Sequence, residues 1–203
     1  MHPLLLLCVA IAANTARAEE NCALKQIASL ALTDDGIHLF VPVTIAGKEL
    51  KFILQLAVAN SGITAGAAAE LALSRRTMPI WLKPSVDGKA ITTLIAVPTI
   101  QIDRLTARDF KLLEISSLSA ANGILGLDIL SAKDLDLDLA HSKANIFSRD
   151  HCTGRVVYWS QPGEAIAEIP MEIGDAAAIH AQMTLDGQVL DVGIGTSGGP
   201  SWG

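Results

Sequence analysis

The sequence predicts an all-β fold with a short helix, because two β-hairpins can be read from its residue pattern. Two runs rich in β-branched and apolar residues, Leu39 to Ile45 and Leu50 to Leu54, flank a turn at Ala46-Gly47-Lys48, as a hairpin requires. Further along, Lys133 to Leu139 alternates strictly between polar and apolar residues. Together with Lys143 to Phe147, this run predicts a second hairpin that buries one face.

The other elements of the predicted fold follow in chain order. Residues 65 to 73 are rich in Ala and Leu, which predicts the short helix behind the loop after the first hairpin. An Asp87-Gly88 turn precedes a predicted strand at Ala90 to Val97, as such turns often do in β-proteins. Further strands are expected at Thr99 to Ile102 and around Phe110 to Ile115.

Composition limits the classes of partner. The chain has 203 residues, half of them apolar, and a formal net charge of −6, which suits one or two compact domains. An acidic chain without a cluster of Lys and Arg lacks the positive surface that phosphate binding needs. We therefore expect no nucleic-acid partner, and no cofactor.

The first 18 residues have the pattern of a signal peptide. Leu4 to Ala13 is apolar but too short to span a bilayer, and Ala16-Arg17-Ala18 matches the small-x-small site of signal peptidase. The mature chain is expected to begin at Glu19 and to be exported, to the periplasm. The weakly charged start leaves a retained anchor open, but no later run is apolar enough to span a membrane.

Two cysteines remain in the expected mature chain, Cys22 and Cys152. A disulfide between them would stabilise the fold by about 4 to 5 kcal/mol in the chain-entropy model; two free thiols are the alternative. No metal site is expected, because His151 beside Cys152 has no second ligand pair at a suitable spacing. Alternate spacing places three carboxylates on one solvated strand face rather than at a metal ion: Asp134, Asp136 and Asp138.

The first hairpin, the loop after it and the segment Asn122 to Leu130 resemble the retropepsin-like family of aspartic proteases, in its exported, two-lobed bacterial form. The resemblance implies a closed β-barrel lobe over residues 19 to 159. In that family the strand ends in Asp-Thr-Gly or Asp-Thr-Ala, whereas the matching residues here are Gln55-Leu56-Ala57. Ser61 matches the family's following Ser, and the Asp87-Gly88 turn stands where the family carries its flap.

A partial second lobe is expected over residues 169 to 203, after a linker at 160 to 168. Its hairpin, with strands from Ile179 to Leu185 and from Gln188 to Ile194, repeats the first one. The repeat brings Gly195-Thr196-Ser197 to the place of the second Asp-Thr-Gly, with Gly195 at the position of the aspartate.

These substitutions matter because family members use two carboxylates that share one proton, one to activate water and one to protonate the substrate. The amide of Gln55 is neutral and cannot act as a base, although it can donate and accept hydrogen bonds. Leu56 also lacks the Thr hydroxyl that ties the two loops together in the family.

The resemblance therefore implies an aspartic-protease-like protein without catalytic residues, which could bind extended peptides or unfolded segments by strand addition. The expected cleft comprises Gln55, Ala57, Ser61, Asp87 and Gly88. Alternatives are an aspartic endopeptidase that uses another carboxylate or a dimeric site, and a truncated product without activity; a homodimer is left open. Gly195 to Pro200 also resembles the serine motif of chymotrypsin-like proteases, but the His and Asp partners of that chemistry are not expected.

Overall fold

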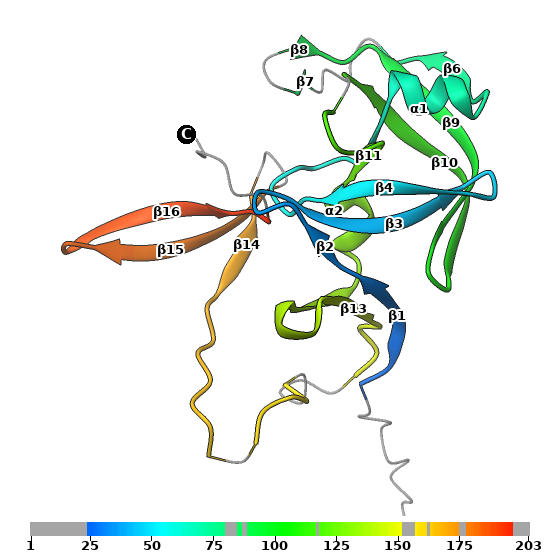
Figure 1. Ribbon diagram of the computed structural model, residues 1–203. Helices are drawn as coiled ribbons and strands as arrows, with labels where there is room; N and C mark the ends of the chain where they lie inside the picture. Colours follow the sequence, from blue (N-terminus) through cyan, green and yellow to red (C-terminus); the bar gives the residue numbers. More distant parts are fainter. Residues whose placement is uncertain are drawn as a thin grey trace, which may run out of the picture.

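The computed structural model describes residues 24–79, 85–86, 89–116, 118–151, 157–161, 163–174 and 178–196. Across these ranges the chain is mostly β, with two short α-helices and one turn of 3₁₀ helix. Figure 1 shows a curled sheet and, projecting from its side, a long hairpin. The all-β prediction is therefore confirmed.

The largest sheet closes into a barrel. Its strand order is β2-β3-β4-β11-β5-β10-β9-β6, and a further pairing of β3 with β9 joins the two ends of the central six strands. Closure leaves those six strands without a free edge over the paired lengths. The strands are β2 (Thr33–Asp34), β3 (Leu39–Ile45), β4 (Lys48–Leu54), β5 (Gly62–Thr64), β6 (Ser74–Thr77), β9 (Thr93–Ile102), β10 (Leu105–Ile115) and β11 (Gly123–Leu125).

The barrel interior is filled by alternate side chains of its strands. Val41, Val43 and Ile45 of β3 are almost completely buried, whereas Pro42 and Thr44 between them are only half-buried. Period-two alternation of this kind places one face of each strand in the core. The largest side chains buried there include Phe52, Leu54, Ile63, Ile95, Leu112 and Leu125.

One glycine allows β4, β5 and β11 to pack closely. A Cβ added to Gly123 of β11 would lie 2.4 Å from the carbonyl oxygen of Gly62 and 2.5 Å from Cε1 of Phe52. Real Cβ atoms do not approach other atoms so closely, so a larger residue would force the strands apart. β4 and β5 flank the loop from Gln55 to Ser61, which forms part of the candidate site described below.

The predicted strands at Ala90 to Val97 and Thr99 to Ile102 are one strand, β9, which begins at Thr93. The predicted strands end and begin on either side of Pro98, a residue that cannot donate a hydrogen bond to a neighbouring strand. Pro98 is exposed and lies between the stretch of β9 that pairs with β6 and the stretch that pairs with β3, a position that tolerates proline.

The predicted helix is shorter than expected. α1 (Ala65–Glu70) is preceded by the N-cap residue Thr64, whose side chain accepts a hydrogen bond from the backbone N–H of Ala67. Such an N-cap satisfies a donor that the first turn leaves free. The helix ends near Ala72, whose φ of 51° lies in the left-handed region.

A smaller sheet joins both ends of the first lobe. β13 (Lys143–Phe147) lies between β1 (Gln26–Ala31) and β12 (Asp134–Asp138), which confirms the predicted second hairpin. The turn contains η1 (Leu139–His141), and α2 (Leu127–Leu130) precedes β12.

The third sheet consists of β14 (Met171–Ile173), β15 (Ile179–Leu185) and β16 (Gln188–Ile194). The bounds of β15 and β16 are those predicted for the repeated hairpin. Both turn residues, Asp186 and Gly187, have positive φ values, 50° and 79°, which matches the right-handed twist of the flanking strands. Ala46 and Gly47 between β3 and β4 have the same values, so the two hairpins share turn geometry as well as strand length.

The predicted flap region also contains a hairpin. β7 (Ser85–Val86) pairs antiparallel with β8 (Lys89–Ala90). Its expected turn residues, Asp87 and Gly88, lie outside the described residues, as do Cys22 and Cys152. No helix in the described part of the chain is long and apolar enough to cross a membrane.

Candidate functional site

The candidate site lies where the two repeated hairpins meet. Gln55 is the first residue after β4 and Gly195 is the first after β16, so each follows a strand of the same length and turn. The side-chain oxygen Oε1 of Gln55 accepts hydrogen bonds from the backbone N–H of Ala57, at 3.2 Å, and of Thr196, at 3.4 Å. Segments that are 141 residues apart are thus joined at one amide oxygen.

The hydroxyl group of Thr196 ties the two loops together. It donates a hydrogen bond to the carbonyl oxygen of Leu54 and accepts one from the backbone N–H of Leu56, at 3.3 Å. Leu54 is the last residue of β4, and Leu56 lies in the loop that follows this strand. Because a threonine hydroxyl has one donor and two acceptor sites, this one side chain satisfies two backbone groups across the junction.

The bridge is one-sided. The equivalent residue of the first loop is Leu56. Its isobutyl group can neither donate nor accept a hydrogen bond, so it makes no matching bonds to the second loop. Leu56 packs instead against the hydrophobic core. The predicted loss of a hydroxyl at position 56 therefore affects the first loop only. In the second loop Thr196 has the hydroxyl and makes both hydrogen bonds across the junction.

Gly195 leaves space beside Gln55. A Cβ at position 195 would lie 3.4 Å from Oε1 of Gln55 and 3.4 Å from the Cβ of Ala57, so a side chain could begin there with little adjustment. The two positions are therefore adjacent in space. Neither residue carries an ionisable group, and a neutral amide beside a glycine cannot supply or take up a proton at neutral pH.

A buried serine, Ser61, and an aspartate, Asp128, fix the far end of the same loop. The hydroxyl of Ser61 donates to Oδ1 of Asp128 at 2.6 Å, and its backbone N–H donates to Oδ2 at 2.9 Å. The same hydroxyl accepts a hydrogen bond from the backbone N–H of Gly126 at 2.9 Å. A carboxylate that accepts two such bonds is a strong anchor. The loop between Gln55 and Ser61 is therefore fixed at both ends.

The segment around Gly126 also packs directly on the loop backbone. The N–H groups of Leu127 and Asp128 donate to the carbonyl oxygens of Val58 and Ala59, at 3.0 and 2.9 Å. A Cβ at Gly126 would lie 2.9 Å from the carbonyl carbon of Asn60, which explains the glycine at the centre of this apolar segment.

The structure corrects one residue of the expected cleft. Ser61 is only 1 % exposed, because its hydroxyl faces Asp128 and Gly126, so it does not line a surface that a peptide could reach. Ala57 is exposed at the apex of the loop, and Gln55 is half-buried. Asp128 was missed by sequence reasoning, since its partner lies 67 residues away and its own segment shows only an apolar motif.

The three carboxylates of β12 lie on one strand face, as predicted, but this face is only partly solvated. All three residues are half-buried. Asp136 accepts hydrogen bonds from Tyr158 at 2.6 Å and from Asn145 at 2.9 Å, and Asp134 contacts His151. The contacts to Asp134 and Asp136 come from residues after β13, in a segment whose sequence shows no periodicity that would predict them. Among the described residues no group of three or more ligands could hold a metal ion.

No protein-family model matches the sequence, and no curated protein matches it either. Among solved structures, a retropepsin-like aspartic protease from Rickettsia conorii is 14 % identical, with a TM-score of 0.46 over 62 % of this chain and 92 % of that one. The retroviral protease-like domain of Ddi1 from Leishmania major is 20 % identical, with a TM-score of 0.40 over 56 % of this chain and 96 % of that one. At such scores neither likeness carries an argument about chemistry, which depends on the residues described above.

The hydrogen bond to Asp136 raises the pKa of Tyr158 above its ordinary value of 10.0, because ionisation would place two negative charges side by side. This contribution to stability is present below pH 10.0 and is lost as the pH rises through the raised pKa. Tyr158 is the chain's one tyrosine, so the near-ultraviolet absorbance of tyrosinate reports it alone. We expect a midpoint above 10.0 that falls towards 10.0 in Asp136→Asn and stays raised in the matched variant Asp134→Asn. Equal midpoints in all three proteins would contradict the contact.

Proposed function

We propose that the chain is an aspartic-protease-like protein that does not catalyse proteolysis and that binds extended segments of unfolded polypeptide. The observation that carries this proposal is the junction of Gln55 and Gly195. The two loops are held together as a two-carboxylate mechanism would require, yet the adjacent positions hold an amide and a hydrogen atom.

The chemistry of the junction supports a non-catalytic role. Peptide hydrolysis by two carboxylates needs one ionised and one protonated oxygen acid within reach of the same water. An amide cannot exchange the proton in that cycle, because it neither ionises nor takes up a proton near neutral pH. The scaffold that positions the loops, including the anchor from Ser61 to Asp128, is nevertheless retained.

The binding surface of the proposal is the outer side of the loop from Gln55 to Ala57. Ala57 is exposed there, and the paired strands β7 and β8 belong to the same lobe. An extended polypeptide can gain affinity through main-chain hydrogen bonds and remain weakly selective for sequence. Unfolded segments are therefore the class of ligand that we assign to this surface.

The place of action in this proposal is the periplasm. It is supported by the apolar run from Leu4 to Ala13 and by the Ala16-Arg17-Ala18 site that follows it. A disulfide between Cys22 and Cys152 belongs to the same proposal, since an oxidising compartment would favour it.

A pair of substitutions tests whether positions 55 and 195 are the former carboxylate positions. In the double variant Gln55→Asp with Gly195→Asp, two like charges would lie close together, so one carboxyl must have a raised pKa in the folded state. Its stabilising effect is present below the unfolded pKa of about 4 and is lost as the pH rises through the raised folded value. We therefore expect the free energy of unfolding to fall between about pH 4 and pH 7.

The matched control for this test is Gln55→Asn with Gly195→Asn, which has nearly the same shape and no charge. The measurement is urea unfolding of both double variants across the pH range. Parallel pH dependence in the two variants would mean that the positions are not adjacent, and would remove the basis of the proposal.

Peptide binding is tested by placing a bulky side chain on the exposed loop. Ala57→Arg should weaken binding of a fluorescein-labelled, reduced and alkylated protein about tenfold or more, which corresponds to about 1.4 kcal/mol. Ala69→Arg is the control, because Ala69 is exposed on α1, and it should change the dissociation constant less than about twofold. Fluorescence anisotropy gives the constants, and a gel should show the bound chain uncut. The binding proposal fails if the unsubstituted protein binds nothing, or if Ala57→Arg binds equally well.

A further inference from the structure

The sheet of β14, β15 and β16 has one apolar face and one polar face. Residues that pair directly across antiparallel strands lie on the same face. The register pairs Met171 with Ala181, Met183 with Leu190, and Ile179 with both Ile173 and Ile194. Every other residue of β15 therefore belongs to one continuous apolar face.

The opposite face is polar and acidic. It carries Glu172, His180, Gln182, Thr184 and Asp191, with Val189 opposite Thr184 as its one large apolar side chain, and His180 contacts Asp191 at 3.0 Å. Because Glu172 and Asp191 lie on this face, two copies brought together through it would place like charges near one another. The apolar face carries no charged residue among the strand positions described.

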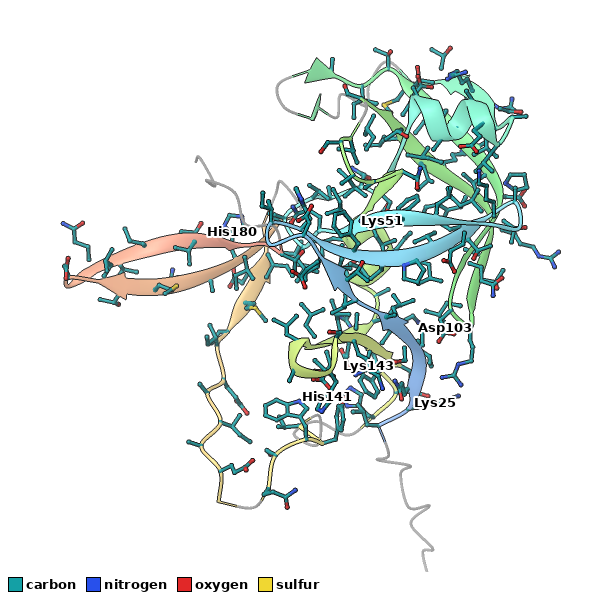
Figure 2. All side chains as sticks on the ribbon, viewed as in Figure 1. Lys25, Lys51, Asp103, His141, Lys143 and His180 are labelled. Carbon is teal, nitrogen blue, oxygen red and sulfur yellow. The ribbon has the colours of Figure 1, made fainter. Side chains whose placement is uncertain are left out.

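Only the inner end of the apolar face is covered by the described part of the first lobe. Ala181 is buried there, and Ile179 packs against the main core. Beyond it, the hairpin projects away from the barrel, as Figure 2 shows with its side chains drawn. Five large side chains of this face remain open, namely Met171, Ile173, Met183, Leu185 and Leu190, which are 57, 55, 58, 63 and 37 % exposed.

The open area matches what a dimer interface needs. Side chains of this size, about half exposed, contribute on the order of 100 Å² each, so the five together offer about 500 Å². A standard interface buries about 800 Å² on each partner, of which somewhat more than half is apolar. The face is thus large enough for a stable contact once its polar rim is included.

We propose that this face is the interface of a homodimer, in which the sheets of two copies pack face to face about a two-fold axis. A flat face without charge is complementary to itself, so a second copy has the right chemistry on both sides. Two β-sheets pack in this way about 10 Å apart, with their side chains interdigitating. This interface is independent of the peptide-binding loop proposed above.

In such a dimer the tip of each hairpin would also contact the partner, at a cavity next to the inner end of the partner's apolar face. At the inner end of the face, Met171, Ile173 and Ile194 border a cavity of about 640 Å³, whose wall also includes Leu56 and Trp159. When the two hairpins run in opposite directions, the tip of each reaches the inner end of the other. Leu185, the apolar residue next to the Asp186-Gly187 turn of the partner's hairpin, then lies over this cavity.

Adjacent residues of β15 supply a matched test. Leu185→Asp places a charge on the apolar face at an exposed position, and Thr184→Asp places the same charge on the polar face one residue away. Sedimentation equilibrium of the full chain should give a dimer whose dissociation constant rises at least about 100-fold in Leu185→Asp, because two unpaired charges would be buried. The constant should change less than about threefold in Thr184→Asp.

Several outcomes would overturn the proposal. A monomer at all concentrations would do so, and so would an equal effect of the two substitutions, or larger assemblies that Leu185→Asp leaves unchanged. A monomer whose apolar face binds the hydrophobic dye bis-ANS, with the binding lost in Leu185→Asp, would assign the face to a different partner. Thermal unfolding followed by circular dichroism should show equal melting temperatures for both variants at concentrations where the protein is monomeric.

Discussion

The hydroxyl of Thr196 is the interaction on which the arrangement of the candidate site depends. It joins the carbonyl oxygen of Leu54 to the backbone N–H of Leu56 and so fixes the end of β16 against the end of β4. These backbone groups are partly buried, and leaving either of them unpaired would cost about 1 to 3 kcal/mol. This contact places Gly195 beside Gln55, because Gly195 directly precedes Thr196 and Gln55 lies between Leu54 and Leu56.

The loop that Thr196 meets is rigid for reasons inside the first lobe. The barrel strands approach closely at Gly123, and the segment after them places Asp128 under Ser61. These contacts hold the loop from Gln55 to Ser61 through groups of the chain itself. The proposed binding role depends on this scaffold alone, whereas proton transfer would need an ionisable pair that Gln55 and Gly195 do not provide.

Sequence reasoning succeeded where the pattern is local. The repeated hairpin was predicted with its bounds, because Asp186-Gly187 is a strong turn signal between strands of clear alternation. It failed where the decisive partner is distant in sequence, as for Ser61 with Asp128 and for Asp136 with Tyr158. Carboxylates at alternate positions look solvated until another segment covers them. The disulfide and the turn of the flap remain predictions.

The most direct test of the account is hydrogen exchange at a single amide, the N–H of Leu56. In the native protein it donates to the hydroxyl of Thr196, so it should exchange slowly, and Thr196→Ser should preserve that protection because serine keeps the hydroxyl. Thr196→Val removes the acceptor at nearly equal volume, and the exchange of this amide, followed by NMR, should accelerate about tenfold or more. Equal protection in the valine and serine variants would show that the two hairpins are not joined through Thr196.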